Sequence, residues 1–348
     1  MPAKNLSPIR RNLLRWYDRH KRDLPWRRTD DPYAIWISET MLQQTQVATV
    51  LPYYERFLRA FPTIEALDRA PLERVLRAWS GLGYYRRAEN LKKAARQIRR
   101  VHGGALPRQF GALSQLPGIG DYTAGALMSI AFHQRHAAVD GNARRVLGRL
   151  FALGDAKPLH AIAGALVPRS RPGDFNQALM ELGATLCIPR DPKCKQCPLS
   201  SNCAASSSPR RSLQRRHRKQ IKFKDVTWPL AIVRQRGRIL LRRRGDNGLL
   251  ARLWELPGGE ITAQAKPLAF LRSELKQLDR TIKGQKLIGE IHHSITYRRI
   301  RAPIYLIDCP ASVELRLPDN HWRWIDPISL PNQAISSMTA KALKRLPP

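Results

Sequence analysis

A strongly basic segment divides this chain into two parts. Between Pro209 and Lys224 the sequence carries eight arginines and lysines and no acidic residue, and Ala204–Ser208 before it is small and polar. Such a segment cannot bury an apolar core, so it is expected to be a linker, and a sequence of 348 residues leaves enough chain on each side for a separate domain. We therefore expect three segments: a first domain at residues 1–203, a linker at 204–227 and a second domain at 228–348.

The two predicted domains have different hydrophobic patterns. In the first, apolar residues recur at helical spacing between short proline and glycine breaks, as in Phe175–Leu186. In the second, Trp228–Arg234 and Arg238–Arg244 resemble two strands around a turn, Phe270–Leu278 resembles a helix and Ile304–Ile307 another strand. The chain is therefore predicted to be multidomain, with an all-α first domain and an α+β second domain.

The net charge points to a polyanionic partner. The chain has 61 lysines and arginines against 27 acidic residues, a formal charge of +34. Nucleic acid is the first candidate, and a solubility charge or a ribosome-like surface is the alternative. No apolar run approaches the roughly 18 residues that span a bilayer, and the N-terminus has no apolar signal region. We expect a protein without membrane contact, nuclear in a cell with a nucleus, or cytoplasmic and nucleoid-associated in a bacterium.

Four of the five cysteines lie close together. Their spacing is C-x6-C-x2-C-x5-C, so four thiolates can converge on one metal centre. Zinc ribbons usually show two close pairs, whereas this cluster has one close pair and two outlying residues, which favours a [4Fe-4S] cluster over a structural zinc. Lys193 and Lys195 lie inside the loop and place positive charge where a DNA backbone could sit. The predicted ligands are Cys187, Cys194, Cys197 and Cys203.

Two further motifs lie between the N-terminus and the cysteines. Leu116–Ala126 predicts a helix, a tight glycine turn and a second helix, and Gly118 and Gly120 allow the backbone to approach a phosphate closely. Val139–Val146 then places Asp140 at the start of another helix. Taken alone, a glycine connector and an ordinary helix cap explain both motifs.

The order and spacing of these motifs resemble those of the helix-hairpin-helix DNA glycosylases related to endonuclease III. Within that superfamily, residues 36–45 (WISETMLQQT) and 81–85 (GLGYY) are similar to adenine DNA glycosylases of the MutY type. The resemblance covers residues 1–203 strongly and the second domain more weakly. It implies a monofunctional glycosylase of base excision repair that flips adenine mispaired with 8-oxoguanine or G out of the duplex and removes it.

The resemblance also implies catalytic roles. Cleaving an N-glycosidic bond calls for an acid that protonates the base and a carboxylate that faces the sugar cation. Glu39 would protonate adenine at N7, Asp140 would stabilise the sugar at C1′, and Tyr122 and Asn142 would orient Asp140 or the attacking water. A solvated helix carboxylate and a helix cap are the alternatives for the two acids. Strand-cutting relatives have a Schiff-base lysine where Tyr122 stands, so no efficient β-elimination is expected.

Other residues are implied to contact DNA. The backbone at Gly118 and Gly120 would meet phosphate. The segment that would enter the duplex and read the partner base comprises Leu42, Gln43, Gln44 and Thr45. The wedge that would fill the space left by the flipped base comprises Leu82 and Tyr84; core packing is the alternative for Tyr84. The residues that would line the adenine pocket are Trp26, Arg27 and Glu181.

The second domain is similar to the MutT-like (Nudix-like) C-terminal domain of the same enzymes, on the evidence of Gly248–Gly259. A pyrophosphohydrolase of that fold needs several carboxylates on one helix to hold magnesium, and Leu271–Gln277 offers a single glutamate, so no nucleotide hydrolysis is expected. We expect the domain to read 8-oxoguanine through the loop around His293 and Ser294, where many relatives have Phe-Ser-His.

Two alternative functions stay open at this point. The first is an endonuclease III-like lyase for oxidised pyrimidines, which Tyr122 and the second domain disfavour. The second is a non-catalytic iron-sulfur protein that only binds DNA. In each case the expected partner is double-stranded DNA, and the protein is expected to be a monomer.

Overall fold

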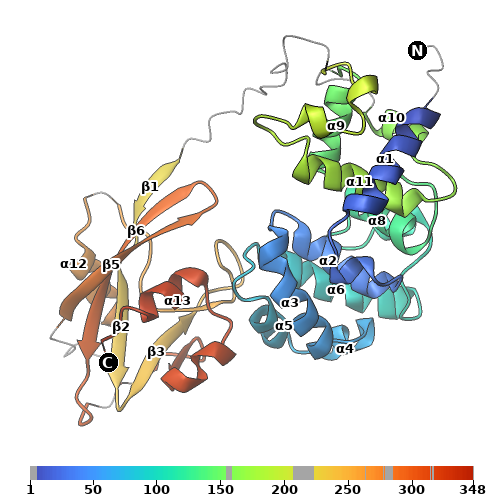
Figure 1. Cartoon of the computed structure of the whole chain (residues 1–348). Helices are drawn as coiled ribbons and strands as arrows, with labels where there is room; N and C mark the ends of the chain where they lie inside the picture. The colour runs from blue at the N-terminus through green and yellow to red at the C-terminus, as the bar shows by residue number, and fades with distance from the viewer. Residues whose placement is uncertain are drawn as a thin grey trace. The chain divides into compact units, whose positions relative to one another are not determined.

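The computed structural model describes residues 6–153, 159–206, 223–262, 264–276, 278, 285–313, 315 and 317–347 (Figure 1). Contacts among these residues define two compact units. The first comprises Met1–Ala70 and Arg86–Arg216, and the second comprises Pro71–Tyr85 and His217–Pro348. Most of the expected linker, residues 207–222, lies outside the described residues. The second unit also takes in residues 71–85 from the N-terminal half, so a single cut in the chain does not separate the two units.

Helices build the first unit. Helix α2 (Pro32–Leu42) begins where the carboxylate of Asp31 accepts hydrogen bonds from the N–H groups of Tyr33 and Ala34, with a proline in the first turn. It is buried from Tyr33 to Met41, with Ser38, Glu39 and Thr40 among mainly apolar residues, and it contacts α3, α6 and α8. The other helices of this unit are α1 (Ser7–His20), α3 (Val47–Ala60), α4 (Ile64–Arg69), α6 (Arg86–Val101), α7 (Phe110–Ser114), α8 (Asp121–Ala126), α9 (Gly141–Leu150), α10 (Leu159–Leu166) and α11 (Pro172–Thr185).

A second group of packed helices forms around α11. The helical face predicted from Phe175 onward is confirmed, because Phe175, Leu179 and Leu182 are buried against α1 and α9. Each fully buried side chain of this kind contributes about 1.5–3 kcal/mol, and Phe175→Ala would cost about 3–5 kcal/mol. This packing fixes the face of α11 that turns Glu181 towards the site described below.

A mixed β-sheet forms the centre of the second unit. Its order is β1-β6-β2-β3-β4, with β5 paired to β6 and β7 paired to β3. Strands β1 and β2 run parallel to β6, and the remaining pairs are antiparallel. The strands are β1 (Lys224–Thr227), β2 (Leu230–Gln235), β3 (Arg238–Arg243), β4 (Trp254–Glu255), β5 (Gln285–Ile295), β6 (Arg298–Asp308) and β7 (Trp322–Ile325).

Both faces of this sheet are covered. Side chains alternate along a strand, so Leu230 and Ile232 of β2 join one apolar cluster while Ala231 and Val233 join the other. Helix α13 (Ser337–Leu343) packs into the first cluster and α12 (Pro267–Leu275) into the second. The helices are seen beside the sheet in Figure 1. The remaining α-helix described in this unit is α5 (Leu72–Trp79), and Pro327–Asn332 forms a short 3-10 helix.

These elements match the predicted fold class, with an all-α first unit and an α+β second unit. Strand β1 lies at the end of the segment expected to be a linker and pairs with β6 from Lys224 onward. No helix in the described part of the chain combines the length and the apolar character needed to cross a bilayer.

Candidate active site

A cleft of about 1070 Å³ opens in the first unit. It is lined by the C-terminal half of α2 and the segment after it, the glycine turn before α8, the start of α9, and α11. Residues that are distant in sequence therefore share one wall. The predicted site residues that line it are Trp26, Arg27, Glu39, Leu42, Gln43, Gln44, Thr45, Gly118, Gly120, Tyr122, Asp140, Asn142 and Glu181.

Glu39 is a buried acid on α2. Its residue is only 5% exposed, and its Oε2 atom accepts a 2.6 Å hydrogen bond from the hydroxyl of Tyr122. Burial raises the pKa of Glu39 to about 7; the bond from Tyr122 opposes this rise and the nearby charge of Asp140 adds to it. A carboxyl group with such a pKa can donate a proton near neutral pH.

Asp140 caps helix α9 while lining the same cleft. Its Oδ1 atom accepts a 2.7 Å hydrogen bond from the Ala143 N–H, and its Oδ2 atom accepts a 3.0 Å bond from the Asn142 amide. Burial raises the pKa of Asp140, and these two bonds counteract the rise because they stabilise the charged form. Asn142 thus orients Asp140, whereas Tyr122, for which the same role was expected, contacts Glu39 instead.

Asn142 is itself held from behind by α11 and Arg145. The Arg145 Nη2 atom donates 2.7 Å hydrogen bonds to Asn142 Oδ1 and to the carbonyl of Gly183. A Cβ atom at Gly183 would lie 2.6 Å from the Cβ of Asn142, so only glycine lets α11 approach the start of α9 this closely. The close approach of Gly183 to Asn142 joins two separate helices, so no spacing within the sequence indicates it.

Glu181 is locked into an ion pair at the cleft wall. Its carboxylate accepts hydrogen bonds of 2.6 and 2.8 Å from Arg22 and of 2.8 Å from Arg27. Although burial disfavours its charge, the bonds from the two arginines lower the pKa of Glu181. It is therefore a fixed anion rather than a proton donor. Trp26 beside it is buried, with its ring edge-on to Tyr54 at 5.3 Å between centroids.

The glycine turn also faces the cleft. Gly118 has φ of +80°, and a Cβ there would lie 2.8 Å from the Cβ of Asn90, so the fold itself requires glycine at this position. At Gly120 a Cβ would meet nothing within 4 Å. The absence of a side chain at Gly120 is thus not a packing requirement, and it leaves the backbone open to a close ligand.

The two wedge candidates belong to the second unit and differ in exposure. Tyr84 is 51% exposed and has φ of +48°, a left-handed conformation that is unusual for a residue with a side chain. Leu82 is only 5% exposed. Of the two wedge candidates, only Tyr84 is therefore exposed in this structure.

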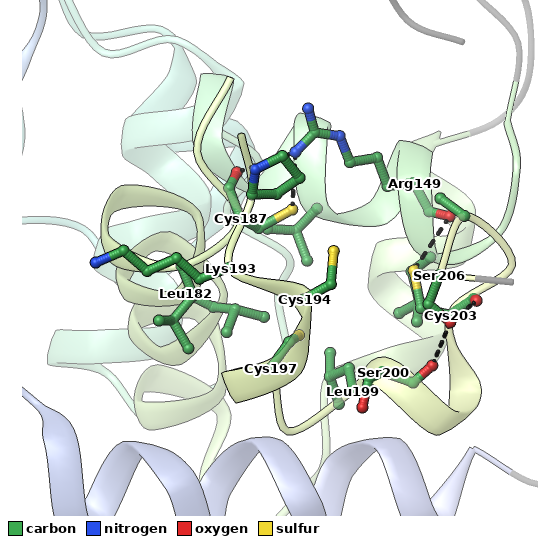
Figure 2. A pocket seen from close by; sticks show the side chains of 15 residues that line it. Arg149, Leu182, Cys187, Lys193, Cys194, Cys197, Leu199, Ser200, Cys203 and Ser206 are labelled. Atoms are coloured by element: carbon green, nitrogen blue, oxygen red, sulfur yellow. Dashed lines mark hydrogen bonds between the residues drawn. The ribbon is translucent and has the colours of Figure 1, made fainter. Parts of the chain in front are cut away.

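The four clustered cysteines line a single cavity (Figure 2). The N–H of Cys197 donates a hydrogen bond to the carbonyl of Cys194, closing a turn between them. Arg149 lies over the loop and donates to the Cys187 sulfur at 3.3 Å and to the Ile188 carbonyl at 2.8 Å. The rest of the lining is mainly apolar and includes Leu182, Leu186 and Leu199.

None of these four cysteines takes part in a disulfide bond. Among the described residues, no group of three or more His, Cys, Asp and Glu side chains is arranged to hold a metal ion. Burial raises the pKa of Cys197 to about 11, and the neighbouring cysteines raise it further. A metal centre bound in this mainly apolar cavity would hold the sulfurs as thiolates.

Both halves of the chain are similar to known protein families. Residues 37–169 match the HhH-GPD superfamily of base excision DNA repair proteins, and residues 229–345 match the NUDIX domain. Adenine DNA glycosylase of Rattus norvegicus is 36% identical, over 98% of this chain and 78% of the rat protein. That of Buchnera aphidicola subsp. Baizongia pistaciae (strain Bp) is 34% identical, over 85% of each chain.

The chain belongs to the adenine DNA glycosylase family. This membership makes it an enzyme of base excision repair that cleaves N-glycosyl bonds. A solved thermostable thymine-DNA glycosylase is also similar, with 35% identity and a TM-score of 0.55 over 58% of this chain and 96% of that one. The first unit thus has a helix-hairpin-helix glycosylase fold, and the second has the predicted Nudix-like fold.

The second unit of this family member contains the residues expected to read the lesion. His293 and Ser294 line a cavity of about 880 Å³ together with Arg299, Arg301 and Lys341. They were expected in a loop, and this is wrong: both lie on strand β5, where His293 pairs with Ile300 of β6. Burial and the charge of Lys341 lower the pKa of His293, which favours the neutral form of its ring.

The carboxylates of the second unit near the Nudix motif are engaged by arginines. Glu274 on α12 accepts a hydrogen bond from Arg242. Glu255 on β4 is buried and accepts bonds from Arg242 at 3.2 Å and from Arg244 at 3.0 Å. Guanidinium groups therefore occupy the positions beside these two acids. The absence of nucleotide hydrolysis stays a prediction for assay.

Several residues of the cleft were missed by sequence reasoning. Met180 accepts a 3.2 Å hydrogen bond from Tyr122 at its sulfur, and Gln177 accepts one of 3.2 Å from Arg27. Thr123 receives a 3.2 Å bond from the Gln43 amide. Met180 and Gln177 lie within one turn of Glu181 on α11, so helical spacing from that predicted residue was the available signal.

Proposed function

We propose that this enzyme removes adenine mispaired with 8-oxoguanine or G from double-stranded DNA. The observation that carries the proposal is that a protonatable acid, Glu39, and a hydrogen-bonded carboxylate, Asp140, line one cleft. The membership in the adenine DNA glycosylase family supports the choice of base. The duplex must release the adenine into the cleft before either acid can reach it.

Each acid then has one task in the cleavage. Glu39 transfers its proton to N7 of adenine, and the electron pair of the bond between C1′ and N9 leaves with the base. The sugar becomes oxocarbenium-like, and the negative charge of Asp140 stabilises it. Water adds to C1′ and gives its proton to the Glu39 carboxylate, which restores the acid. Asn142 keeps Asp140 turned towards the cleft through its 3.0 Å hydrogen bond.

The chain is proposed to act without cutting the strand. A lyase of this superfamily would need an amine nucleophile in the cleft, and the position in question holds Tyr122, a phenol hydrogen-bonded to Glu39. Borohydride reduction during turnover should therefore trap no enzyme–DNA adduct. Efficient trapping would favour the lyase alternative.

The remaining contacts follow the walls of the cleft and the exposed residues. Gln43, Gln44 and Thr45 are proposed to read the partner base, and the backbone at Gly118 and Gly120 to meet phosphate. Tyr84 is proposed as the wedge on the ground of its exposure. The cavity at His293 and Ser294, with its basic neighbours, is proposed to read 8-oxoguanine. These contacts need only one copy of the chain, which we propose acts as a monomer on chromosomal DNA.

The cysteine loop is proposed to hold a [4Fe-4S] cluster. Cys187, Cys194, Cys197 and Cys203 supply four sulfur ligands around one mainly apolar cavity, a donor set that suits an iron-sulfur cluster. The cluster would crosslink the loop and so have a structural role. Lys193 and Lys195 are exposed on the same loop and are proposed to contact the DNA backbone.

A single-turnover assay tests the central proposal. Duplexes holding A opposite 8-oxoguanine, G or T are incubated with excess wild type, Glu39→Gln or Asp140→Asn, and free adenine is measured. Wild type is expected to release adenine opposite 8-oxoguanine and G faster than opposite T, and both variants to lose release while still binding. Intact release by Glu39→Gln would overturn the catalytic assignment. Wild-type binding without release would support the DNA-binding alternative.

A further inference from the structure

Arg87 lies in the first turn of α6 and sends its guanidinium to the end of α2. The residue is only 8% exposed. Its Nη1 atom donates hydrogen bonds to the carbonyls of Thr40 at 3.0 Å, Met41 at 2.8 Å and Gln43 at 2.6 Å, and its Nη2 atom donates to Thr45 Oγ1 at 3.0 Å. One side chain therefore binds four acceptors that lie within six residues of each other.

The end of α2 needs such a partner. The last four carbonyls of a helix have no N–H within the helix to bind, and the negative end of the helix dipole attracts a cation. A buried arginine is in turn costly unless acceptors surround it. The guanidinium of Arg87 thus supplies hydrogen-bond donors to the carbonyls after Glu39, and these carbonyls supply acceptors to the buried charge. The planar fork of the guanidinium lets one residue reach several acceptors.

The same acceptors belong to the segment proposed to read the partner base. Gln44 has φ of +59°, a strained conformation for a residue with a side chain, so the turn needs support from its surroundings. The Thr45 hydroxyl donates to the Gln43 carbonyl at 3.4 Å, and both are bound by Arg87. Gln43 in turn reaches Thr123 with its amide. Arg87 braces this turn from inside the protein, and it is not among the residues that line the cleft.

We propose that Arg87 is a positioning residue that sets the preference of the enzyme for the base opposite adenine. It acts by holding Gln43–Thr45 in the conformation that reads this base, and it touches neither substrate nor reacting atoms. The inference rests on the proposed function of that segment. It differs from a purely structural role in one respect: loss of Arg87 contacts should change the rates on different mispairs unequally.

The test compares variants by their rate per active molecule. Arg87→Lys keeps the charge but cannot form the fork, and Thr45→Val removes one acceptor from the other side. Active enzyme is counted by burst amplitude, and single-turnover rates are measured for A opposite 8-oxoguanine, G and T. Both variants are expected to lower the ratio of the 8-oxoguanine rate to the T rate by about tenfold, the worth of one charge-assisted hydrogen bond. Their combined effect should be smaller than the product of the two, because they break one contact.

Arg99→Lys is the matched control. Arg99 also lies on α6 and binds the buried carboxylate of Asp68, so its loss should lower stability without changing the rate ratio. An unchanged ratio in Arg87→Lys, with only the active fraction and the melting temperature reduced as in Arg99→Lys, would overturn the proposal. Multiplicative effects of Arg87→Lys and Thr45→Val would do the same.

Gln44→Ala separates this inference from the function on which it rests. If Gln44→Ala changes the rate ratio and neither Arg87→Lys nor Thr45→Val does, the segment reads the partner base but Arg87 does not set its geometry. If Gln44→Ala leaves the ratio unchanged, the proposed reading function of the segment fails, and the inference about Arg87 fails with it. Because Thr45 itself belongs to the reading segment, Thr45→Val supports the role of Arg87 only through its non-additivity with Arg87→Lys.

Discussion

The phenol of Tyr122 and the carboxyl group of Glu39 are joined by a 2.6 Å hydrogen bond although 83 residues separate them in the chain. The bond acts against the effect of burial on Glu39: burial raises the pKa of this acid to about 7, and donation from Tyr122 lowers it. Tyr122 therefore affects the pKa of Glu39, in addition to leaving the cleft without an amine nucleophile at this position. It keeps the proton of Glu39 available at a pH near neutrality.

The pH dependence of kcat/KM should reveal this bond. Glu39 must be protonated to act, so activity is expected to fall as the pH rises through about 7. Asp140 must be ionised, and its pKa is raised, so the acid limb should lie above the range of an ordinary aspartate. Tyr122→Phe removes a bond that lowers the pKa of Glu39 and should move the alkaline limb to higher pH.

Tyr33→Phe is a suitable control for the Tyr122 experiment. Tyr33 lies on the same helix as Glu39, but its hydroxyl donates to the carbonyl of Phe61. Its loss should reduce stability and leave the alkaline limb in place. A Tyr122→Phe profile that coincides with that of wild type would show that the hydrogen bond does not tune Glu39.

The buried acid should make the wild-type enzyme less stable at high pH than Glu39→Gln. The folded-state pKa of Glu39 is about 7, above its value of 4.5 in an unfolded chain. The folded state thus holds the extra proton between these values, and stability falls as the pH rises through this window. The difference in unfolding free energy should reach about 3 kcal/mol at pH 8 and vanish near pH 4. Urea unfolding at both pH values measures it; a constant difference would contradict the raised pKa.

The close approach of α11 to Asn142 predicts a steric defect. In Gly183→Ala the new methyl group would lie 2.6 Å from the Asn142 Cβ and 3.0 Å from its Cα, so the start of α9 must move. We expect a loss of about 1–3 kcal/mol in stability and a decrease of about a hundredfold in the rate of adenine release, because Asp140 moves with α9. Gly164→Ala is the control, since a Cβ there meets nothing within 4 Å; its rate should match that of wild type.

Chemical analysis tests the cysteine loop. Purified protein is expected to contain iron and acid-labile sulfide in equal amounts, close to four of each per chain as a [4Fe-4S] cluster requires. Cys197→Ser should lose most of both. Cys309→Ser, in the second unit and outside the loop, should retain them. Stoichiometric zinc without sulfide would refute the cluster and restore the zinc alternative.

Salt titration tests the exposed lysines of the same loop. Replacing Lys193 and Lys195 by alanine should lower the slope of log K against log salt by about two, because each lysine releases about one counterion from DNA. The rate of adenine release at saturating enzyme should not change, since neither residue lines the cleft. Gln196→Ala between them is the neutral control. An unchanged slope of log K against log salt would show that the loop does not contact the DNA backbone.

Sequence reasoning found the residues whose role shows in a local motif. The glycine turn at Gly118 and the helix start at Asp140 are short-range features, and both appear in the structure as predicted. The partner of Tyr122, and the arginines that neutralise Glu181, depend on how separate helices pack. No spacing in the chain encodes such contacts, so the hydrogen bond between the Tyr122 hydroxyl and Glu39 was not predicted.

The second unit was harder to predict in detail. Its fold followed from the short apolar runs of β2 and β3 on either side of a turn. The position of His293 on a strand could not be predicted in the same way, because a strand with half-exposed polar residues resembles a loop in sequence. The burial of Leu82 was equally hidden: a leucine between two glycines gives no indication of which neighbour will cover it.

Asp140 holds the N-terminus of α9 with the same carboxylate that faces the cleft. Asparagine caps helices about as well as aspartate does, so an amide at this position would preserve the folded protein and its grip on DNA while abolishing the charge needed for cleavage. The Asp140→Asn enzyme would therefore stay bound to the mispair without cleaving it and would block the access of other repair enzymes to the same site.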